Sequence, residues 1–314
     1  MNYSSQKIDA PSYPLISAIV LSYNRREDLQ RTLTNLLQDS YPSLEIIVVD
    51  NASIDNSGEM VHTDFPTVKL IQLNTNIGIA GWNEGMKVAS GEYFLCLDDD
   101  SYPLSDSLQK ILPSLCSTKI LSLKIVTPSG QLDSPYFDTS FQQRTFIGCG
   151  VIIPKYIYKT IGGFNQTLFI YQHELDYSIR AIDKGFSIQY VPEAIVCHSR
   201  SRGNREIQNG RDRRVMYYMT RNSLIIVLQY FSLQKIIGRI ARILLGRLSF
   251  AVFSGTFLIT VKAIIDGLNQ GWKYRNSSTI VSRKTQEFYE YGKYAGSFFC
   301  DGLYGFKRPK FLNK

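Results

Sequence analysis

The chain has 314 residues, 44% of them hydrophobic and 20% charged, which excludes a disordered protein and allows a large core. The net charge of +8 combines an acidic part, with 14 Lys/Arg against 21 Asp/Glu in residues 1–199, and a basic part, with 21 against 6 in residues 200–314. The five cysteines are widely spaced and include no C-x-x-C pair, which argues against a zinc knuckle and favours free thiols in a reducing compartment.

The polar residues 1–14 are predicted to be a tail, and they show no apolar signal core that would indicate export. Four apolar runs follow, separated by helical patterns: SAIVLS (17–22), LEIIVVD (44–50), VKLIQL (68–73) and EYFLCLD (92–98). Apolar strands without alternation, separated by helices, indicate a mainly parallel sheet that is covered on both faces. We therefore predict a doubly wound α/β domain over residues 15–205, with ligands beyond the carboxyl ends of the strands.

The pattern changes to shorter and more polar strands at 118–155, and residues 206–314 are predicted to be helical, basic and amphipathic, with one long segment ending near Leu268. Nucleic-acid-binding arms rarely carry so many apolar runs, so we predict no nucleic-acid partner and instead contact with an anionic membrane surface. The uncharged run Leu248–Val261 is shorter than the roughly 20 residues that span a bilayer, which favours lying on the membrane. The alternative is a buried helix with a cationic outer face.

The four predicted strands all end in polar or acidic residues, as a ligand crevice at one edge of a sheet requires. The endings are SYNR, VVDNAS, LNTNIGIAGWN and LDDDSYP. The chain lacks G-x-G-x-x-G after its first strand and has no G-x-x-x-x-G-K-[ST], which argues against dinucleotide and P-loop folds. Adjacent carboxylates such as those of LDDDS repel one another unless a cation neutralises them. Mg²⁺ or Mn²⁺ bound with substrate phosphates would do so, and a loop that caps the next helix is the alternative.

Several motifs, in their order and spacing, resemble the family-2 inverting glycosyltransferases with the GT-A fold. They are AIVLSYNRREDLQRTL, LEIIVVDNASIDNS, NIGIAGWNEG, YFLCLDDD, FIGCGVIIPK and HELDYSIRA followed by YVPEAIVCH. The resemblance runs from about residue 17 to 198, and YYMTRNSL extends it to 224. The subgroup it resembles most is that of the bacterial rhamnosyl- and galactofuranosyltransferase-like enzymes.

The resemblance implies a nucleotide-sugar site and a divalent metal, Mg²⁺ or Mn²⁺. In such enzymes the aspartate that ends the second strand, here Asp50, accepts the N3–H of uracil or thymine. Asp98 is assigned to the ribose side, Asp100 to the metal that bridges the diphosphate, and His198 to the third metal position. The further nucleotide-facing candidates are Tyr23, Asn76, Gly78 (for close backbone approach), Asp99 and Lys155 (for the diphosphate charge, unless it is an ordinary exposed lysine).

The segment YQHELDYSIR matches the E-D-x-D segment of the family, with His173 in place of the glutamate and Glu174 in place of the aspartate. The second position holds the base that removes the acceptor proton, so the resemblance assigns this role to Glu174. Asp176 keeps its identity and is the second catalytic candidate, although its i,i+4 spacing to Arg180 is typical of a structural ion pair. For Glu174 the alternative is a first-turn acid favoured by the helix dipole.

The resemblance implies transfer of a sugar from a UDP- or dTDP-linked donor to a hydroxyl of a glycan or lipid-linked acceptor in bacterial surface polysaccharide synthesis. Because Q-x-x-R-W is absent, we predict addition of one sugar at a time by a cytoplasmic enzyme that is peripheral on the inner face of the plasma membrane. A homo-oligomer is compatible with the sequence. The altered E-D motif supports the alternative, an inactive nucleotide-sugar-binding or membrane-surface module. A nucleotidyltransferase is disfavoured because no glycine- and basic-rich loop follows the first strand.

Overall fold

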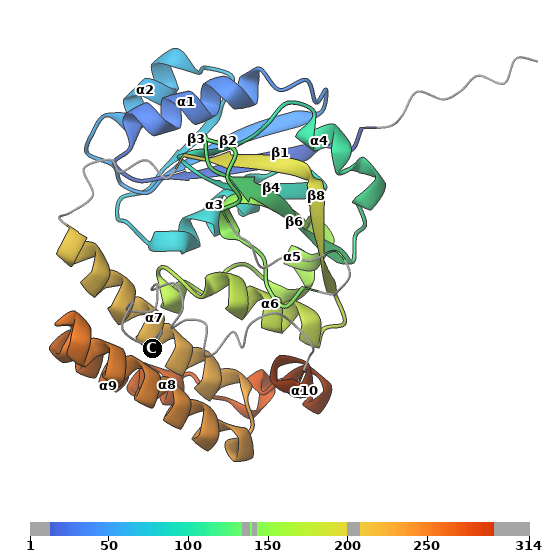
Figure 1. Ribbon diagram of the computed structural model, residues 1–314. Helices are drawn as coiled ribbons and strands as arrows, with labels where there is room; N and C mark the ends of the chain where they lie inside the picture. Colours follow the sequence, from blue (N-terminus) through green and yellow to red (C-terminus); the bar gives the residue numbers. More distant parts are fainter. Residues whose placement is uncertain (1–12, 134–138, 140–142, 200–207, 292–314) are drawn as a thin grey trace, which may run out of the picture.

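The computed structural model describes residues 13–133, 139, 143–199 and 208–291, which form an α/β sheet with a helical layer packed beneath it (Figure 1). The strands are β1 (Ile16–Ser22), β2 (Leu44–Asp50), β3 (Lys69–Gln72), β4 (Tyr93–Asp98), β5 (Ser101–Pro103), β6 (Lys119–Val126), β7 (Val151–Pro154) and β8 (Ser187–His198). The helices are α1 (Arg26–Leu37), α2 (Ser57–Asp64), α3 (Gly81–Val88), α4 (Ser107–Lys110), α5 (Lys155–Ile161), α6 (His173–Asp183), α7 (Gln208–Tyr230), α8 (Leu233–Ser254), α9 (Phe257–Lys273) and α10 (Arg283–Tyr291).

The eight strands form one sheet in the order β3-β2-β1-β4-β7-β6-β8-β5. The four predicted strands are confirmed as its parallel half, in which β2 and β4 flank β1 and β3 pairs with β2. The other half is mixed, because β7 runs antiparallel to β4 and β6, and β5 runs antiparallel to β8. The prediction of a mainly parallel sheet therefore holds for the first hundred residues, and the sheet as a whole is mixed.

The central strands are buried on both faces, which explains why their sequences do not alternate. In β1, Ala18 and Val20 belong to a core under α1, α2 and α4, whereas Ile19 belongs to a second core under α3, α5 and α6. Both faces are thus closed by helices, as Figure 1 shows above and below the sheet. In sheets covered in this way, ligands bind beyond the carboxyl ends of the strands.

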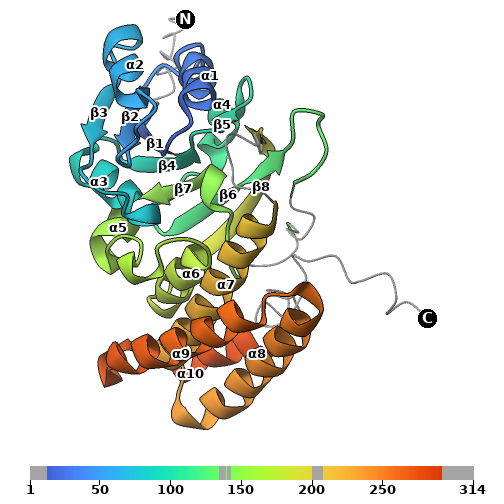
Figure 2. The same ribbon diagram turned by 90° about the vertical axis from the view of Figure 1, so that its left-hand side faces the viewer.

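A third core joins α6 to the carboxyl-terminal helices. Leu175 and Ile179 of α6 pack with apolar residues of α7, including Leu224 and Leu228, and α8 and α9 lie side by side against α7 (Figures 1 and 2). The segment predicted to run unbroken to Leu268 divides at Gly255, whose φ of 66° ends α8. In the part of the chain that the structure describes, no helix is both long enough and apolar enough to cross a membrane. The predicted domain boundary near residue 205 lies outside the described residues.

Candidate functional site

Parallel register brings the ends of β1, β2 and β4 to one edge of the sheet. Ser22 pairs with Asp50, and Leu21 pairs with Asp98. The Asp50 side chain is held by its own loop, because one carboxylate oxygen accepts a hydrogen bond from the Ser53 N–H at 3.0 Å. Asp50 thus lies buried at the strand end where the sequence predicted a base-binding aspartate.

The loop after β3 folds onto the end of β2 through asparagine side chains. Asn51, which the sequence reasoning missed, accepts from the Ile77 N–H at 2.9 Å and donates to the Gly78 carbonyl at 3.0 Å. The Asn76 side chain accepts from the Gly78 N–H at 2.8 Å. These bonds place the loop beside Asp50. The Asn76 side-chain oxygen is already bonded to the Gly78 N–H, so it serves the conformation of the loop.

Gly78 permits a close backbone approach, as predicted, but the approaching backbone belongs to this chain. Its φ is +64°, and a Cβ at this position would overlap the carbonyl oxygen of Phe169. The same oxygen accepts from the Ile79 N–H at 2.8 Å. Gly78 therefore joins the β3 loop to the segment that precedes α6, and its predicted contact with the nucleotide stays a prediction.

Arg25 is the main basic group of the acidic cluster after β4, and the sequence reasoning missed it. Its Nη1 lies 2.6 Å from Asp99 Oδ1 and 2.8 Å from Asp100 Oδ2. The other oxygen of Asp99 accepts from the backbone N–H of Tyr23 at 3.2 Å, while the Tyr23 ring is 43% exposed. Asp99 thus ties two strand-end loops together, which replaces its predicted nucleotide contact. The sequence did contain a signal for this ion pair. Arg25 follows β1, and the acids follow β4, which pairs in parallel with β1.

His198 reaches Asp100 because β5 pairs with β8, with Ser101 opposite His198. The imidazole Nε2 lies 3.3 Å from Asp100 Oδ1, and Nδ1 lies 3.0 Å from an oxygen of Asp133. Burial by itself raises the pKa of Asp100, but His198 and Arg25 outweigh it and lower the pKa to about 2. Burial likewise lowers the pKa of His198, and its bonds to the two carboxylates raise it above the ordinary value. The structure thus joins the two residues predicted to bind metal.

The donor set around His198 fits a divalent cation. Ligand atoms of Asp98, Cys149 and His198 all lie within 4.8 Å of one another, and Asp100 contacts the same imidazole. Asp133, which no sequence motif indicated, holds Nδ1 so that Nε2 faces the cluster, as partners of metal-binding histidines do. Burial, together with the charge of Asp100, raises the pKa of Asp98, an electrostatic cost that a bound cation would relieve.

The base was predicted at the start of α6, where Glu174 and His173 lie together. Oε2 of Glu174 is 3.3 Å from Nδ1 of His173, and the glutamate side chain is 25% exposed. The His173 ring is buried against Trp82 and Phe164, with ring centroids 5.6 and 5.7 Å away. A Cβ on Gly148 would lie 2.9 Å from His173 Nε2 and 3.5 Å from Glu174 Oε1. Since Cys149 follows directly, the Glu174–His173 pair lies against one residue of this turn, and the next residue belongs to the metal-ligand cluster.

Asp176 was a catalytic candidate, and its surroundings contradict that assignment. The residue is fully buried. Its carboxylate accepts from the Tyr230 hydroxyl at 2.7 Å, from Asn165 at 3.0 Å and from Arg180 at 3.0 Å. All of its partners are structural, so Asp176 joins α6 to α7 and is not available to a substrate.

Lys155 was predicted to meet the diphosphate, and this prediction is wrong. It follows β7, which is antiparallel to β4, so that Pro154 pairs with Tyr93 at the amino end of β4. The ammonium group donates to the carbonyls of Ala89 and Ser90 at 3.0 and 3.3 Å. Lys155 therefore lies at the opposite edge of the sheet from Asp98.

The segment before α6 is held by α7. Phe169, Tyr171 and Gln172 all have positive φ, a conformation that costs free energy in non-glycine residues. Asn222 holds this segment, because its Nδ2 donates to the carbonyls of Leu168, Ile170 and Tyr171 at 2.8–2.9 Å. The neighbouring Arg221 donates to the Thr167 carbonyl at 2.8 Å. These two residues of the TRNSL motif position the segment that leads to Glu174.

Replacing Asn222 with alanine is expected to destabilise the protein by about 1–3 kcal/mol, because buried carbonyls lose their donor. Turnover is expected to fall by up to about a hundredfold, because a shift of the start of α6 moves Glu174. Thermal unfolding and steady-state kinetics measure the two effects. The matched control is Asn269→Ala on the exposed face of α9, which should change neither. Unchanged turnover in the Asn222 variant would show that α7 does not position the site.

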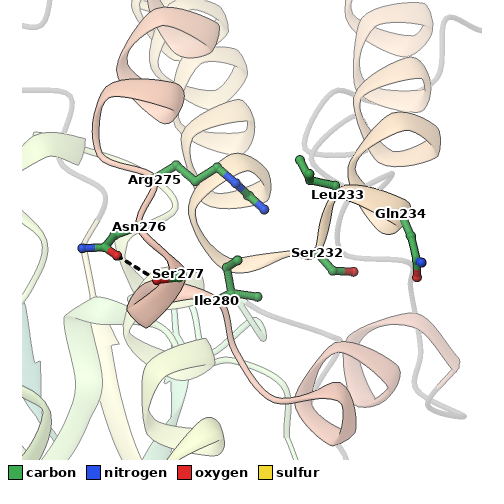
Figure 3. A pocket seen from close by; sticks show the side chains of 7 residues that line it. All are labelled: Ser232, Leu233, Gln234, Arg275, Asn276, Ser277 and Ile280. Atoms are coloured by element: carbon green, nitrogen blue, oxygen red, sulfur yellow. Dashed lines mark hydrogen bonds between the residues drawn. The ribbon is translucent and has the colours of Figure 1, made fainter.

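One hollow in the described structure lies elsewhere, at the turn between α7 and α8 and the segment after α9 (Figure 3). The residues that line it are Ser232, Leu233, Gln234, Arg275, Asn276, Ser277 and Ile280. None of them carries a carboxylate, and none was a predicted site residue. Arg275 donates to the carbonyls of Leu228 and Phe231 and so caps the end of α7. We regard this hollow as part of the helical scaffold.

Comparison with known proteins agrees with this geometry. Poly-beta-1,6-N-acetyl-D-glucosamine synthase from Staphylococcus epidermidis is 41% identical over 90 residues, which are 27% of this chain and 22% of that protein. The match thus spans only about a fifth of the length of that relative. GalNAc-T7, solved with UDP, GalNAc and Mn²⁺, superposes with a TM-score of 0.60 at 13% identity over 84% of this chain and 57% of its own.

S. aureus TarS 1–349, solved in complex with UDP-GlcNAc, superposes with a TM-score of 0.54 at 17% identity, covering 84% of this chain and 82% of its own. These structures share the fold, which confirms the predicted GT-A architecture of the sheet region. Residues 17–179 match the profile described as glycosyl transferase family 2. Because this match covers more than half of the sequence, the chain belongs to glycosyl transferase family 2.

Proposed function

We propose that this chain is an inverting, non-processive glycosyltransferase that uses a UDP- or dTDP-sugar. The observation that carries the proposal is the turn at Gly148, which lies against Glu174 and His173 and continues into Cys149 of the acidic cluster. A carboxylate base thus lies close to, but separate from, a group of residues suited to a diphosphate and its cation. The base that activates the acceptor and the groups that stabilise the leaving diphosphate must lie in the same crevice, because they act on the same bound substrates.

The chain's residues divide the reaction as follows. Asp50 accepts a hydrogen bond from the pyrimidine base, which favours uracil and thymine nucleotides. Glu174 removes the proton from the acceptor hydroxyl as that oxygen bonds to the anomeric carbon of the donor. The bond between that carbon and the diphosphate oxygen breaks on the opposite face, so the configuration inverts and the nucleoside diphosphate leaves. Asp100 and His198 would hold a divalent ion, which when bound neutralises charge on the diphosphate. Asp98, expected on the ribose side, is proposed as a further ligand because its carboxylate lies in the same cluster as His198.

The acceptor is proposed to be a hydroxyl of a glycan or lipid-linked glycan in bacterial surface polysaccharide synthesis. The similarity to the S. epidermidis poly-beta-1,6-N-acetyl-D-glucosamine synthase supports this class of acceptor. UDP in the GalNAc-T7 structure and UDP-GlcNAc in the TarS structure support a UDP-sugar donor, and Mn²⁺ in the former supports a divalent ion. A homo-oligomer remains a prediction.

The test is release of nucleoside diphosphate from a panel of UDP-, dTDP- and GDP-sugars, with and without Mn²⁺ or Mg²⁺. We expect ion-dependent release from at least one UDP- or dTDP-sugar and no release from GDP-sugars. If the protein binds UDP or dTDP but turns over no donor under any condition, the inactive binding module becomes the better description. The replacement of the usual acid by His173 is the feature that favours that second reading.

The carboxyl-terminal helices are proposed to hold the protein on the inner face of the plasma membrane. Three large apolar side chains of α8 and α9 are strongly exposed: Ile237 at 77%, Phe253 at 77% and Leu258 at 84%. The exposed basic residues Arg242 and Lys262 belong to the same two helices. Helices that expose both large apolar side chains and cations are suited to the interface of a bilayer with anionic lipids.

Replacing Phe253 and Leu258 together with serine is expected to lower binding to anionic vesicles by tenfold or more. Each large apolar side chain that leaves water contributes about 1.5–3 kcal/mol, which exceeds a tenfold change for two. Co-sedimentation with vesicles that contain anionic or only zwitterionic lipids measures the effect. The matched control is Leu37→Ser, an exposed leucine of α1. Equal binding by the wild type and the double variant would remove this face as the membrane contact.

A further inference from the structure

A buried thiol lies among the residues proposed to bind the cation, and no motif assigned it a role. Cys149 is 4% exposed and lies in the short turn Gly148–Gly150 that enters β7. Its Sγ belongs to the cluster in which ligand atoms of Asp98, Cys149 and His198 lie within 4.8 Å of one another. The sulfur also has a hydrogen-bond contact with the His198 side chain. The thiol therefore points at the same imidazole that contacts Asp100.

The turn that carries Cys149 is fixed on both sides. A Cβ on Gly150 would overlap the Ile125 side chain and lie 3.3 Å from Val196, so this glycine packs tightly against β6 and β8. A Cβ on Gly148 would lie 2.9 Å from His173 and 3.2 Å from Trp82. Both neighbours of Cys149 thus pack closely against other elements, which positions the backbone that carries the sulfur before any ion binds. Ligands fixed in advance are what a metal site requires.

We propose that Cys149 Sγ is a further donor to the cation site of Asp98, Asp100 and His198, and that it makes this site prefer thiophilic divalent ions over Mg²⁺. The inference rests on the proposed function and deepens it, because it concerns the metal choice of the same site. Carboxylates suit Mg²⁺ and Mn²⁺, imidazole suits Zn²⁺ and Co²⁺, and thiolate adds a strong preference for softer ions. The thiol proton passes to solvent when such an ion binds.

The preference has a consequence for the enzyme. With two carboxylates, one imidazole and one thiolate, the site resembles the mixed nitrogen, sulfur and oxygen sets that bind Zn²⁺. Zn²⁺ and Cd²⁺ should therefore displace Mg²⁺ from the site at much lower concentrations. Without the sulfur, the remaining donors discriminate less between these ions and Mg²⁺.

The experiment is a Co²⁺ titration of the full chain without nucleotide, followed in the near ultraviolet, where sulfur-to-cobalt charge transfer absorbs. We expect this band in the wild type, its loss in Cys149→Ser and its retention in Cys197→Ser. Cys197 is the matched control, because it is an equally buried thiol that directly precedes His198, and its side chain alternates to the other face of β8. Competition between Co²⁺ and Zn²⁺ should show at least a tenfold weaker Zn²⁺ affinity in Cys149→Ser.

A wild type that binds Co²⁺ without the charge-transfer band overturns the proposal, whether or not the variants fold. An unchanged band in Cys149→Ser, checked for folding by its thermal unfolding, overturns it as well. Nucleotide-sugar turnover with Mn²⁺ is measured separately. Turnover without the band would contradict the thiol ligand and leave the proposed function standing. The band without turnover would support the thiol ligand and contradict the proposed function.

Discussion

Replacing Glu174 with glutamine is expected to lower the turnover number by about a hundredfold to ten thousandfold, the usual contribution of a general base. Glutamine keeps the size of the side chain and its contact with His173 but cannot accept the acceptor's proton. Because Glu174 lies across the Gly148 turn from the acidic cluster, the affinity for the nucleotide should stay within about twofold. Steady-state release of UDP or dTDP and calorimetric titration with the nucleotide measure the two quantities.

The aspartate variant and a distant control sharpen this test. Glu174→Asp gives the residue that the resemblance to family 2 expects at this position and should retain more activity than Glu174→Gln. Glu193→Gln removes an exposed carboxylate of β8 and should leave turnover unchanged. If Glu174→Gln turned over at the wild-type rate, the base would have to be another group, and no other carboxylate at the start of α6 is free for this role, since Asp176 is buried among structural partners.

The surroundings of His173 explain how a histidine fits where the family resemblance leads one to expect an acid. Its ring lies between Trp82 and Phe164, and the nearby Gly148 provides room for Nε2. An aromatic slot accommodates an imidazole ring well, whereas a second carboxylate at this position would face Glu174 with like charge. The substitution is therefore compatible with a working base and does not by itself indicate loss of activity.

The first hundred residues could be predicted from the sequence because their structure depends on local patterns. Each parallel strand is an apolar run, and parallel pairing alone brings the strand ends near Asp50 and Asp98 together. Lys155 was misplaced because the sequence does not show that β7 runs antiparallel to β4. One reversed strand moves a residue from one edge of the sheet to the other.

The residues that were missed are those whose partners lie far away in the sequence. Asp133 meets His198 only because β6 and β8 are neighbours, and no spacing along the chain indicates this pair. Asn222 holds carbonyls that lie more than fifty residues earlier. The Asn222 contacts arise from the packing of α7 against the segment before α6. The TRNSL motif can therefore identify Asn222, but it does not show which carbonyls this residue holds.

Replacing Asp100 with asparagine is expected to weaken Mn²⁺ binding and to lower turnover by about a hundredfold to a thousandfold, the cost of losing one group that stabilises developing charge. The variant should still fold, because Arg25 keeps its 2.6 Å ion pair with Asp99 and His198 keeps its contact with Asp133. The concentration of free Mn²⁺, measured by electron paramagnetic resonance, reports the binding loss without any turnover.

The matched control for Asp100→Asn is Asp64→Asn, which removes the same charge from the exposed end of α2. It separates loss of a ligand from the change in net charge, because a long-range effect on a cation is screened within about 10 Å at ordinary ionic strength. Wild-type Mn²⁺ affinity in Asp100→Asn would place the ion away from His198 and contradict the proposed site. Weaker Mn²⁺ binding with full turnover would show instead that the β5–β8 pairing joins two ligands of the ion, but that sugar transfer does not depend on the ion.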